Sequence, residues 1–193
     1  MTDFLACVRA QRVLPVLRAD DADAAAGRAL RLLGAGCRVV ELTTTIPDWS
    51  RALRRVTDEA GDGALVGLGT VTTAEQALRA VDIGATFLVS PYAAPDVRTV
   101  ARDAGVPFLE GGFTPTELAN AAAHGPVKLF PAHAGGPAYL ASVRTILPDA
   151  AVIPTGGVRL DDVDAYLRAG AVAAGVGSGL PDDPAALAEL FAR

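Results

Sequence analysis

Residues 127–131 read Val-Lys-Leu-Phe-Pro, a short apolar run around the only lysine of the chain, Lys128. The run is too short for a helix and has the composition of a buried strand. Seven similar runs are spaced along the 193 residues. They are apolar almost throughout, which favours strands that are buried on both faces. The eight predicted strands cover residues 13–17, 38–42, 64–68, 86–90, 107–109, 127–130, 151–154 and 172–176.

Amphipathic segments with helix signals lie between these runs. Most of them end at a glycine, a residue that readily adopts the left-handed backbone conformation in which many helices stop. At the start of one segment, Thr114–Glu117 has the pattern of a capping box with proline at the first helical position. Eight strand–helix units in residues 1–193 predict a single-domain α/β fold, a (β/α)8 TIM barrel, although an open doubly wound sheet is the alternative. The predicted helices are 21–33, 48–59, 73–83, 94–104, 116–124, 160–168 and 181–193, and the glycine stops are Gly34 with Gly36, Gly61, Gly84, Gly105, Gly125 and Gly170.

Composition excludes several classes of protein. The chain is 51% hydrophobic and 20% charged, with a formal net charge of −5 that is mixed along the sequence, so we expect no nucleic-acid partner. No apolar run approaches the ~18 residues of a membrane span, and Met1–Val8 lacks the pattern of a signal peptide. We therefore expect a cytoplasmic protein that acts on a small molecule. Cys7 and Cys37 are interpreted as small buried residues.

Lys128 is the first candidate catalytic residue, because chemistry in this fold takes place at the carboxyl ends of the strands. The other sixteen basic residues are arginines. An arginine is not usefully deprotonated, whereas a lysine amine can attack a carbonyl. Burial in an apolar strand disfavours the charged form and so favours the free amine. The alternative is that Lys128 points outward and extends along the helix layer.

Glu41 ends another strand, among the threonines 43–45. Schiff-base chemistry needs a group that moves protons, and a partly buried carboxyl with a raised pKa serves this purpose. The alternative is that Glu41 caps a helix or pairs with Arg18. Arg18, at the end of the first strand, is a candidate clamp for a carboxylate or else part of a surface salt bridge. Thr70 either donates to a substrate oxygen or caps a helix.

Two glycine-rich loops follow the last two predicted strands, at Thr155-Gly156-Gly157 and at Gly177-Ser178. Glycines let backbone N–H groups approach phosphate oxygens, which predicts a phosphate site, although both could be simple tight turns. His124 and His133 are isolated and have no carboxylate at ligand spacing, so we predict no metal site. Trp49 and Tyr139 are interpreted as packing residues.

Seven stretches in order along the chain resemble the 2-keto-3-deoxy-6-phosphogluconate (KDPG) and 4-hydroxy-2-oxoglutarate (KHG) aldolases, together with the phosphogalactonate aldolases. Each stretch is weak evidence alone, but the ordered set, which runs from about residue 10 to residue 180, is specific. The stretches are LPVLR (14–18), VELT (40–43), GLGTV (67–71), FLVSP (87–91), TPTE (114–117), VKLFPA (127–132) and PTGGV (154–158).

The resemblance implies a class I aldolase, usually a homotrimer, that needs no metal or cofactor and forms pyruvate and an aldehyde. It implies that Lys128 is the Schiff-base residue and Glu41 the general acid/base. It also implies substrate contacts. Those that we predict are Arg18, Thr45, Thr70, Pro91 and Phe130 for the substrate, and Thr155, Gly156, Gly157, Gly177 and Ser178 for a phosphate group.

The sequence departs from the family pattern near the predicted mouth of the barrel. Thr45 stands where many members have a carboxylate-binding arginine, and Arg18 is a candidate replacement. Tyr92, Glu110 and Phe113 make this region more aromatic and more acidic than usual. Two other functions stay open at this point: a non-catalytic relative that binds a sugar phosphate or keto acid, and a phosphate-binding isomerase or epimerase.

Overall fold

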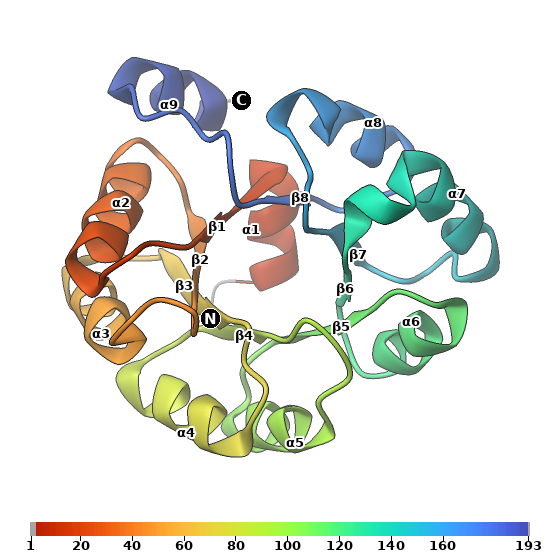
Figure 1. Cartoon of the computed structure of the whole chain (residues 1–193), viewed down its shortest axis with the longest axis horizontal. Helices are drawn as coiled ribbons and strands as arrows, with labels where there is room; N and C mark the ends of the chain where they lie inside the picture. Colours follow the sequence, from red (N-terminus) through yellow and green to blue (C-terminus); the bar gives the residue numbers. More distant parts are fainter. Residues whose placement is uncertain (1–2, 193) are drawn as a thin grey trace.

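The computed structural model describes residues 3–192 and shows a barrel of parallel strands inside a ring of helices (Figure 1). The predicted (β/α)8 barrel is therefore confirmed. The strands are β1 (Val13–Leu17), β2 (Val39–Thr43), β3 (Leu65–Gly69), β4 (Phe87–Val89), β5 (Phe108–Gly112), β6 (Val127–Leu129), β7 (Val152–Pro154) and β8 (Ala174–Val176).

The strands follow chain order around the barrel, from β1 to β7, and β8 pairs with β1. The remaining gap, between β7 and β8, is closed by a parallel bridge from Thr155 to Gly175. A hydrogen bond of 3.0 Å from the Val172 amide to the Val152 carbonyl supports the same junction. Closure is why an open doubly wound sheet is wrong for this chain.

The helices pack outside the strands, with one exception at the amino-terminal end. Helix α1 (Phe4–Gln11) crosses the barrel axis in Figure 1, and the ring of Phe4 contacts that of Phe87 with centroids 4.7 Å apart. It therefore covers one end of the barrel. The others are α2 (Ala22–Gly34), α3 (Trp49–Glu59), α4 (Ala74–Ile83), α5 (Pro95–Ala104), α6 (Pro115–Ala122), α7 (Gly136–Ile146), α8 (Val163–Arg168) and α9 (Pro184–Phe191), with 3-10 turns at Ala132–Ala134 and Leu160–Asp162.

Several predicted boundaries are wrong. Helices α1 and α7 were not predicted as segments, and α9 is shorter than 181–193, of which residue 193 lies outside the described residues. The predicted stop at Gly61 is also wrong, because α3 ends at Ala60 in an extended conformation, whereas Gly84 and Gly105 have the left-handed φ values of 108° and 68°. Strand β5 continues to Gly112, so Glu110 lies in a strand and not in a loop.

Alternation along the strands separates two buried layers. One face contributes Val16, Val89, Leu109 and Ile153 to a core inside the barrel that also contains Phe4 of α1. The other face packs against the helices, as Leu42 and Leu68 do. The interior is tightly filled, since a side chain at Gly67 would overlap the ring of Phe87. In the part of the chain that the structure describes, no helix is long and apolar enough to span a membrane.

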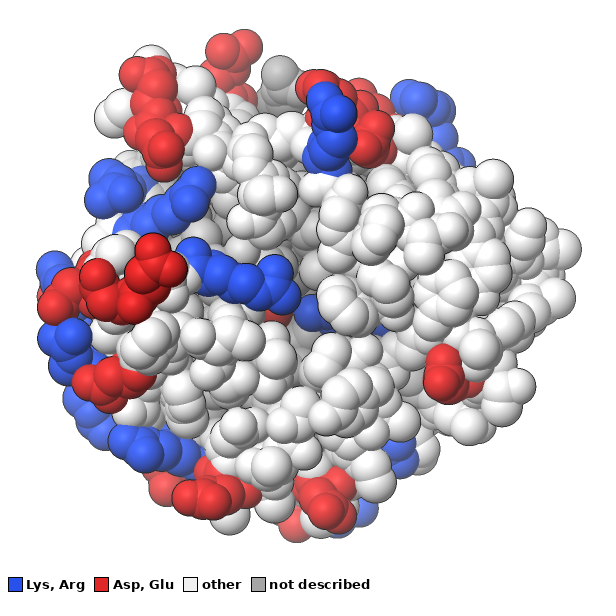
Figure 2. Space-filling model, viewed as in Figure 1, with Lys and Arg blue, Asp and Glu red and all other residues white. Residues whose placement is uncertain are grey.

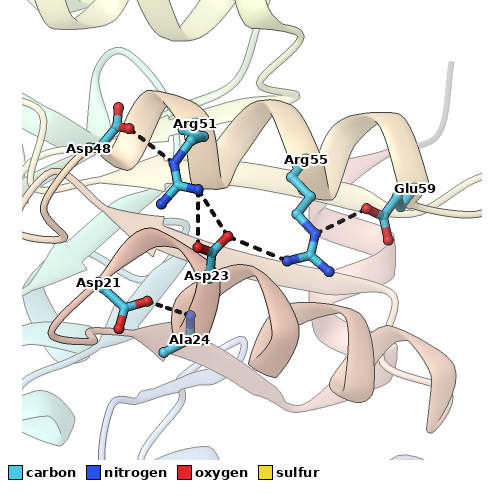
Figure 3. Close-up of polar contacts among 7 residues, drawn as sticks. All are labelled: Asp21, Asp23, Ala24, Asp48, Arg51, Arg55 and Glu59. Atoms are coloured by element: carbon cyan, nitrogen blue, oxygen red, sulfur yellow. Dashed lines mark hydrogen bonds and ion pairs between the residues drawn. The ribbon is translucent and has the colours of Figure 1, made fainter.

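Surface ion pairs join two neighbouring helices of the outer ring. Arg51 and Arg55 of α3 contact Asp23 of α2 at 3.0 and 3.6 Å (Figure 3). Asp21 caps the first turn of α2 by accepting from the amide of Ala24 at 2.7 Å. All three members of the ion-pair cluster are exposed, so the network lies on the rim and not in the core.

Candidate active site

Lys128 and Glu41 meet inside the barrel. Their side chains are 4% and 1% exposed, and the Lys128 Nζ lies 3.7 Å from the Glu41 Oε1. The two residues come from β6 and β2, on opposite sides of the barrel, so only closure brings them together. The alternative that Lys128 points outward into the helix layer is wrong.

Glu41 has no hydrogen-bond partner on either carboxylate oxygen in the described part of the chain. Burial raises the pKa of Glu41, and the nearby charges of Lys128 and then Arg18 oppose this rise only in part. Its carboxylate lies over the α-carbon of Gly69, where any side chain would overlap it. A carboxyl that is dry, unsatisfied and next to an amine is suited to accept and return a proton.

A cavity of about 220 Å³ adjoins this pair and is lined by all five residues predicted to bind a phosphate group, but by only two of the five predicted to bind the rest of the substrate, Arg18 and Phe130. Phe130 forms part of its wall, and the Lys128 Nζ lies 5.4 Å from the centroid of the Phe130 ring. The amine is therefore adjacent to the cavity. The residues that line the cavity are Val16, Arg18, Phe130, Thr155, Gly156, Gly157, Gly177 and Ser178.

Arg18 supplies the positive charge on this cavity. It follows β1, is exposed, and forms no ion pair with any residue that the structure describes. Its guanidinium also approaches Gly177, where a side chain would lie 3.6 Å from Nη1. The alternatives of a surface salt bridge and of a direct pair with Glu41 are both wrong. The guanidinium is available for an anionic group of a ligand.

The two glycine-rich loops face the same cavity. Gly156 and Gly157 have left-handed φ values of 92° and 72°, so successive peptide groups can turn their N–H groups to one side. Within residues 3–192, the amides of Gly156, Gly157 and Ser178 donate to no backbone or side-chain acceptor in the protein. Free amides beside an unpaired guanidinium form an anion-binding surface.

The threonines after β2 and β3 form a hydrogen-bonded rim. The Thr43 hydroxyl donates to the Leu17 carbonyl at 2.9 Å, so the 2.8 Å contact between the Thr43 and Thr45 hydroxyls uses the hydrogen of Thr45. Thr45 therefore offers lone pairs rather than a donor, and it is a poor replacement for the missing arginine. Thr70 has a φ of 59°, and its carbonyl accepts from the Thr44 hydroxyl at 2.7 Å.

Thr70 is strained by about 1–2 kcal/mol, because left-handed backbone is costly for a residue with a branched side chain. It directly follows Gly69, on which the Glu41 carboxylate rests. The strain is thus located beside the buried carboxylate, as expected where a hydroxyl is held for a ligand.

The loop after β4 is fixed by Ser90. Its hydroxyl donates to the Tyr92 carbonyl at 2.6 Å and accepts from the Gly111 amide at 3.2 Å. Pro91, between them, lies so close to Gly111 that a side chain there would overlap the proline backbone. Pro91 is half-buried and does not line the cavity, whereas Tyr92 is 57% exposed.

Glu110 does not line the mouth of the barrel, contrary to the prediction. It points outward from β5 and accepts two hydrogen bonds from Arg98, at 2.9 and 2.8 Å, and one from the Ala94 amide at 2.7 Å. Phe113 stacks on Tyr139 with ring centroids 5.0 Å apart, which agrees with a packing role for Tyr139. The negative charge of Glu110 is therefore neutralised by the ion pair with Arg98 and does not face the mouth of the barrel.

Three further residues shape the site, although no role in it was predicted for them. Gly69 leaves room for the Glu41 carboxylate, Thr43 anchors the threonine rim, and His133 contacts the Gly156 carbonyl. Gly69 carried a signal, because a glycine two residues along β3 from Gly67 marks a close approach on the same inward face. No group of three His, Cys, Asp or Glu side chains with metal-site geometry occurs among residues 3–192.

The charge distribution on one face sets this site apart from its surroundings. In Figure 2, acidic and basic side chains gather over α2 and α3 and along the rim, while the area over α6 and α7 is largely uncharged. Basic atoms also reach the centre of this face, where the barrel lies in Figure 1. An anion that approaches the barrel thus meets positive charge at its centre.

Comparison with known proteins gives a consistent result. The sequence profile of the KDPG and KHG aldolase family matches residues 5–189. A probable 2-dehydro-3-deoxy-6-phosphogalactonate aldolase of Rhizobium meliloti (strain 1021) is 34% identical over 171 residues, which cover 87% of this chain and 81% of the relative. A 2-dehydro-3-deoxy-phosphogluconate aldolase of Pseudomonas aeruginosa is 34% identical over 162 residues, or 82% of this chain and 73% of the relative.

A solved structure shows the same fold over nearly the full length. The KDPG aldolase of Legionella pneumophila, with pyruvate captured as a covalent carbinolamine intermediate, superposes with a TM-score of 0.86 at 28% identity. The match covers 99% of this chain and 98% of that one.

Proposed function

The chain belongs to the KDPG and KHG aldolase family, and we propose that Lys128 and Glu41 perform its class I aldolase chemistry on a 2-keto-3-deoxy sugar acid or a 4-hydroxy-2-oxo acid. The observation that carries this proposal is the buried pair itself, with Nζ and Oε1 3.7 Å apart. A binding protein has no need of an unsatisfied carboxylate beside a buried amine, which costs stability.

The reaction begins when the neutral Lys128 amine attacks the C2 carbonyl of the substrate. A carbinolamine forms, its hydroxyl takes a proton from the Glu41 carboxyl and leaves as water, and a protonated imine and the Glu41 carboxylate remain. Glu41 then takes the proton of the C4 hydroxyl. The electron pair of the C3–C4 bond moves toward the imine, so the aldehyde departs and an enamine remains. Glu41 returns this proton to C3, and water hydrolyses the protonated imine to pyruvate and the free amine, with the released proton restoring the Glu41 carboxyl.

The cavity residues bind the two anionic ends of the substrate in this proposal. Arg18 receives the carboxylate next to the reacting carbonyl, in place of the arginine that Thr45 replaces, and the Thr70 hydroxyl supports it. The free amides of Gly156, Gly157 and Ser178 bind a phosphate group of the aldehyde portion. Phe130 forms part of the cavity wall beside the Lys128 amine.

The test is reduction with borohydride in the presence of pyruvate, followed by intact-mass measurement and peptide mapping. Since Lys128 is the only lysine, a reduced adduct in its peptide identifies the nucleophile. The Lys128→Arg variant is the matched control, because it keeps the charge and cannot form the imine. Absence of an adduct in the unaltered protein contradicts the proposed chemistry.

We further propose that the protein is cytoplasmic and that it is a homotrimer, the assembly that the family resemblance implies. Sedimentation velocity on the full chain measures its mass directly. A monomeric mass at micromolar concentration overturns the trimer without affecting the assignment of Lys128.

A further inference from the structure

His133 contacts the phosphate-site loop through one carbonyl. The Gly156 carbonyl accepts from the His133 backbone amide at 3.0 Å and lies 3.1 Å from the ring Nδ1. A carbonyl oxygen can only accept, so Nδ1 carries the hydrogen in this contact. The ring thus supplies a second donor to the same oxygen.

This contact fixes the direction of the next amide. In a trans peptide the C=O of one residue and the N–H of the next point to opposite sides. The Gly156 carbonyl points to His133, which does not line the cavity, and the Gly157 N–H points away from His133. Since Gly156 and Gly157 both line the cavity, that N–H is directed toward the ligand space.

Packing holds the loop in the same position from both sides. A side chain at Gly156 would come within 2.8 Å of the Phe130 ring, and one at Gly157 within 2.7 Å of the His133 Nδ1. The two glycines are therefore clamped between Phe130 and His133. Both glycines have left-handed backbone. Because glycine can adopt many backbone conformations, the 155–157 loop depends on these contacts to stay in one of them.

We propose that His133 is a positioning residue for a phosphate monoester: it orients the Gly157 amide toward the phosphate oxygens. This inference rests on the proposed function for its substrate, a phosphorylated aldehyde or sugar acid, and deepens it. His133 acts through the loop and does not touch the reacting atoms. It follows that His133 affects the binding of phosphate but not the formation of the imine with pyruvate, which has no phosphate.

Two variants of equal size separate hydrogen bonding from packing. In His133→Asn the amide nitrogen occupies the place of Nδ1 and can donate to the Gly156 carbonyl, whereas His133→Leu cannot donate. His124→Asn is the control, because His124 is exposed at the far end of α6 and lies outside the cavity. His133→Ala provides a further variant without the donor if the leucine does not fold.

The first measurement is calorimetric titration with inorganic phosphate, which needs no catalysis. The dissociation constant is expected to rise about five- to tenfold in the leucine variant and by about twofold or less in the asparagine variant, since one oriented hydrogen bond is lost. Equal constants for leucine, asparagine and the unaltered protein overturn the role of His133. Equal losses for leucine and asparagine also overturn it, because packing alone then explains them.

The second measurement is the aldol addition of pyruvate to glyceraldehyde 3-phosphate or to unphosphorylated glyceraldehyde. For the leucine variant we expect a KM about five- to tenfold higher for the phosphorylated aldehyde only, with kcat unchanged. Equal rises for both aldehydes contradict the proposal. The borohydride adduct with pyruvate is measured in parallel for each variant and for the unaltered protein. If the unaltered protein forms no adduct, the aldolase function is refuted. If the adduct forms but phosphate binding is the same in the leucine variant as in the unaltered protein, only the role of His133 is refuted.

Discussion

Two glutamates of the same barrel are almost equally buried and have opposite surroundings. Glu41 is 1% exposed and Glu110 is 2% exposed. Glu110 accepts three hydrogen bonds, from Arg98 and the Ala94 amide, whereas Glu41 accepts none in the described structure. The difference is that the carboxylate proposed to be catalytic lies unsatisfied inside the barrel, whereas the ion-paired carboxylate lies between the barrel and the helices.

Strand alternation is the cause of this separation. Glu41 lies on the face of β2 that also carries Val39 into the barrel core. Glu110 is one residue from Leu109, which belongs to that same core, so Glu110 faces the helix layer. The outward side chain finds Arg98 of α5, and the inward one finds only Lys128 within ion-pair distance among the described residues.

The largest effect is expected from replacing Lys128. Lys128→Met removes the proposed nucleophile and leaves an apolar side chain of similar length in an apolar strand, so the fold should persist. We expect kcat/KM to fall by at least about ten-thousandfold, since no other amine can form the imine in the barrel. Steady-state pyruvate release and far-UV circular dichroism check both parts, and residual activity within about a hundredfold of the unaltered protein contradicts the assignment.

The second largest effect on activity is expected from Glu41→Gln. It removes the proposed proton carrier and keeps the shape of the side chain, so kcat should fall by about 10²- to 10⁴-fold while the pyruvate adduct on Lys128 still forms slowly. The melting temperature is not expected to fall, because an unsatisfied carboxyl is removed. A cleavage rate close to that of the unaltered protein would show that another group moves the protons.

Glu110→Ala is expected to lower stability and to leave activity nearly unchanged, the reverse of what we expect for Glu41→Gln. It leaves the Arg98 guanidinium and the Ala94 amide without their acceptor, which should lower the free energy of unfolding by about 2 kcal/mol, given that Arg98 is partly exposed. Catalysis at 25 °C should change by less than about threefold. Urea unfolding and kcat measure the two effects, with Glu110→Gln as the milder control. A larger loss of kcat than of stability would place Glu110 at the site after all.

These contrasts also show what the sequence could reveal. The strands were predictable because buried parallel strands appear as apolar runs, and the Lys128–Glu41 pair because their residue types stand out at strand ends. Glu110 was misplaced because Gly111 and Gly112 after it resemble a loop. The inward orientation of Leu109, from which the outward orientation of Glu110 follows, is known only from the structure.

Other features depend on contacts that no local pattern records. Helix α1 is held by Phe4 against Phe87, 83 positions further along the chain. The contact from His133 to Gly156 spans 23 residues and joins two loops. Helix α7, by contrast, left a local signal, because Pro137 occupies its first turn.

A smaller effect is expected on the pH dependence of stability, which depends on the environment of Glu41. Burial raises the pKa of Glu41 in the folded state. At pH values between the ordinary carboxyl pKa and this raised pKa, Glu41 is therefore protonated in the folded protein and ionised in the unfolded chain. The associated stability is complete below the ordinary value and is lost as pH rises through the raised value. The difference in unfolding free energy between the unaltered protein and Glu41→Gln should therefore fall with rising pH. A difference that is constant with pH contradicts the raised pKa.

The smallest effect is expected at the exposed ion pairs between α2 and α3 (Figure 3). Asp23 contacts Arg51 at 3.0 Å and Arg55 at 3.6 Å, but each arginine keeps a second partner, Asp48 at 3.0 Å or Glu59 at 3.0 Å. Water and salt screen such pairs, so Asp23→Ala should shift the melting temperature by about 2 °C or less and leave kcat unchanged. Calorimetry at low and high salt checks this, with Asp23→Asn as control. A shift as large as that of Glu110→Ala would show that the outer rim, and not only the buried layer, determines stability.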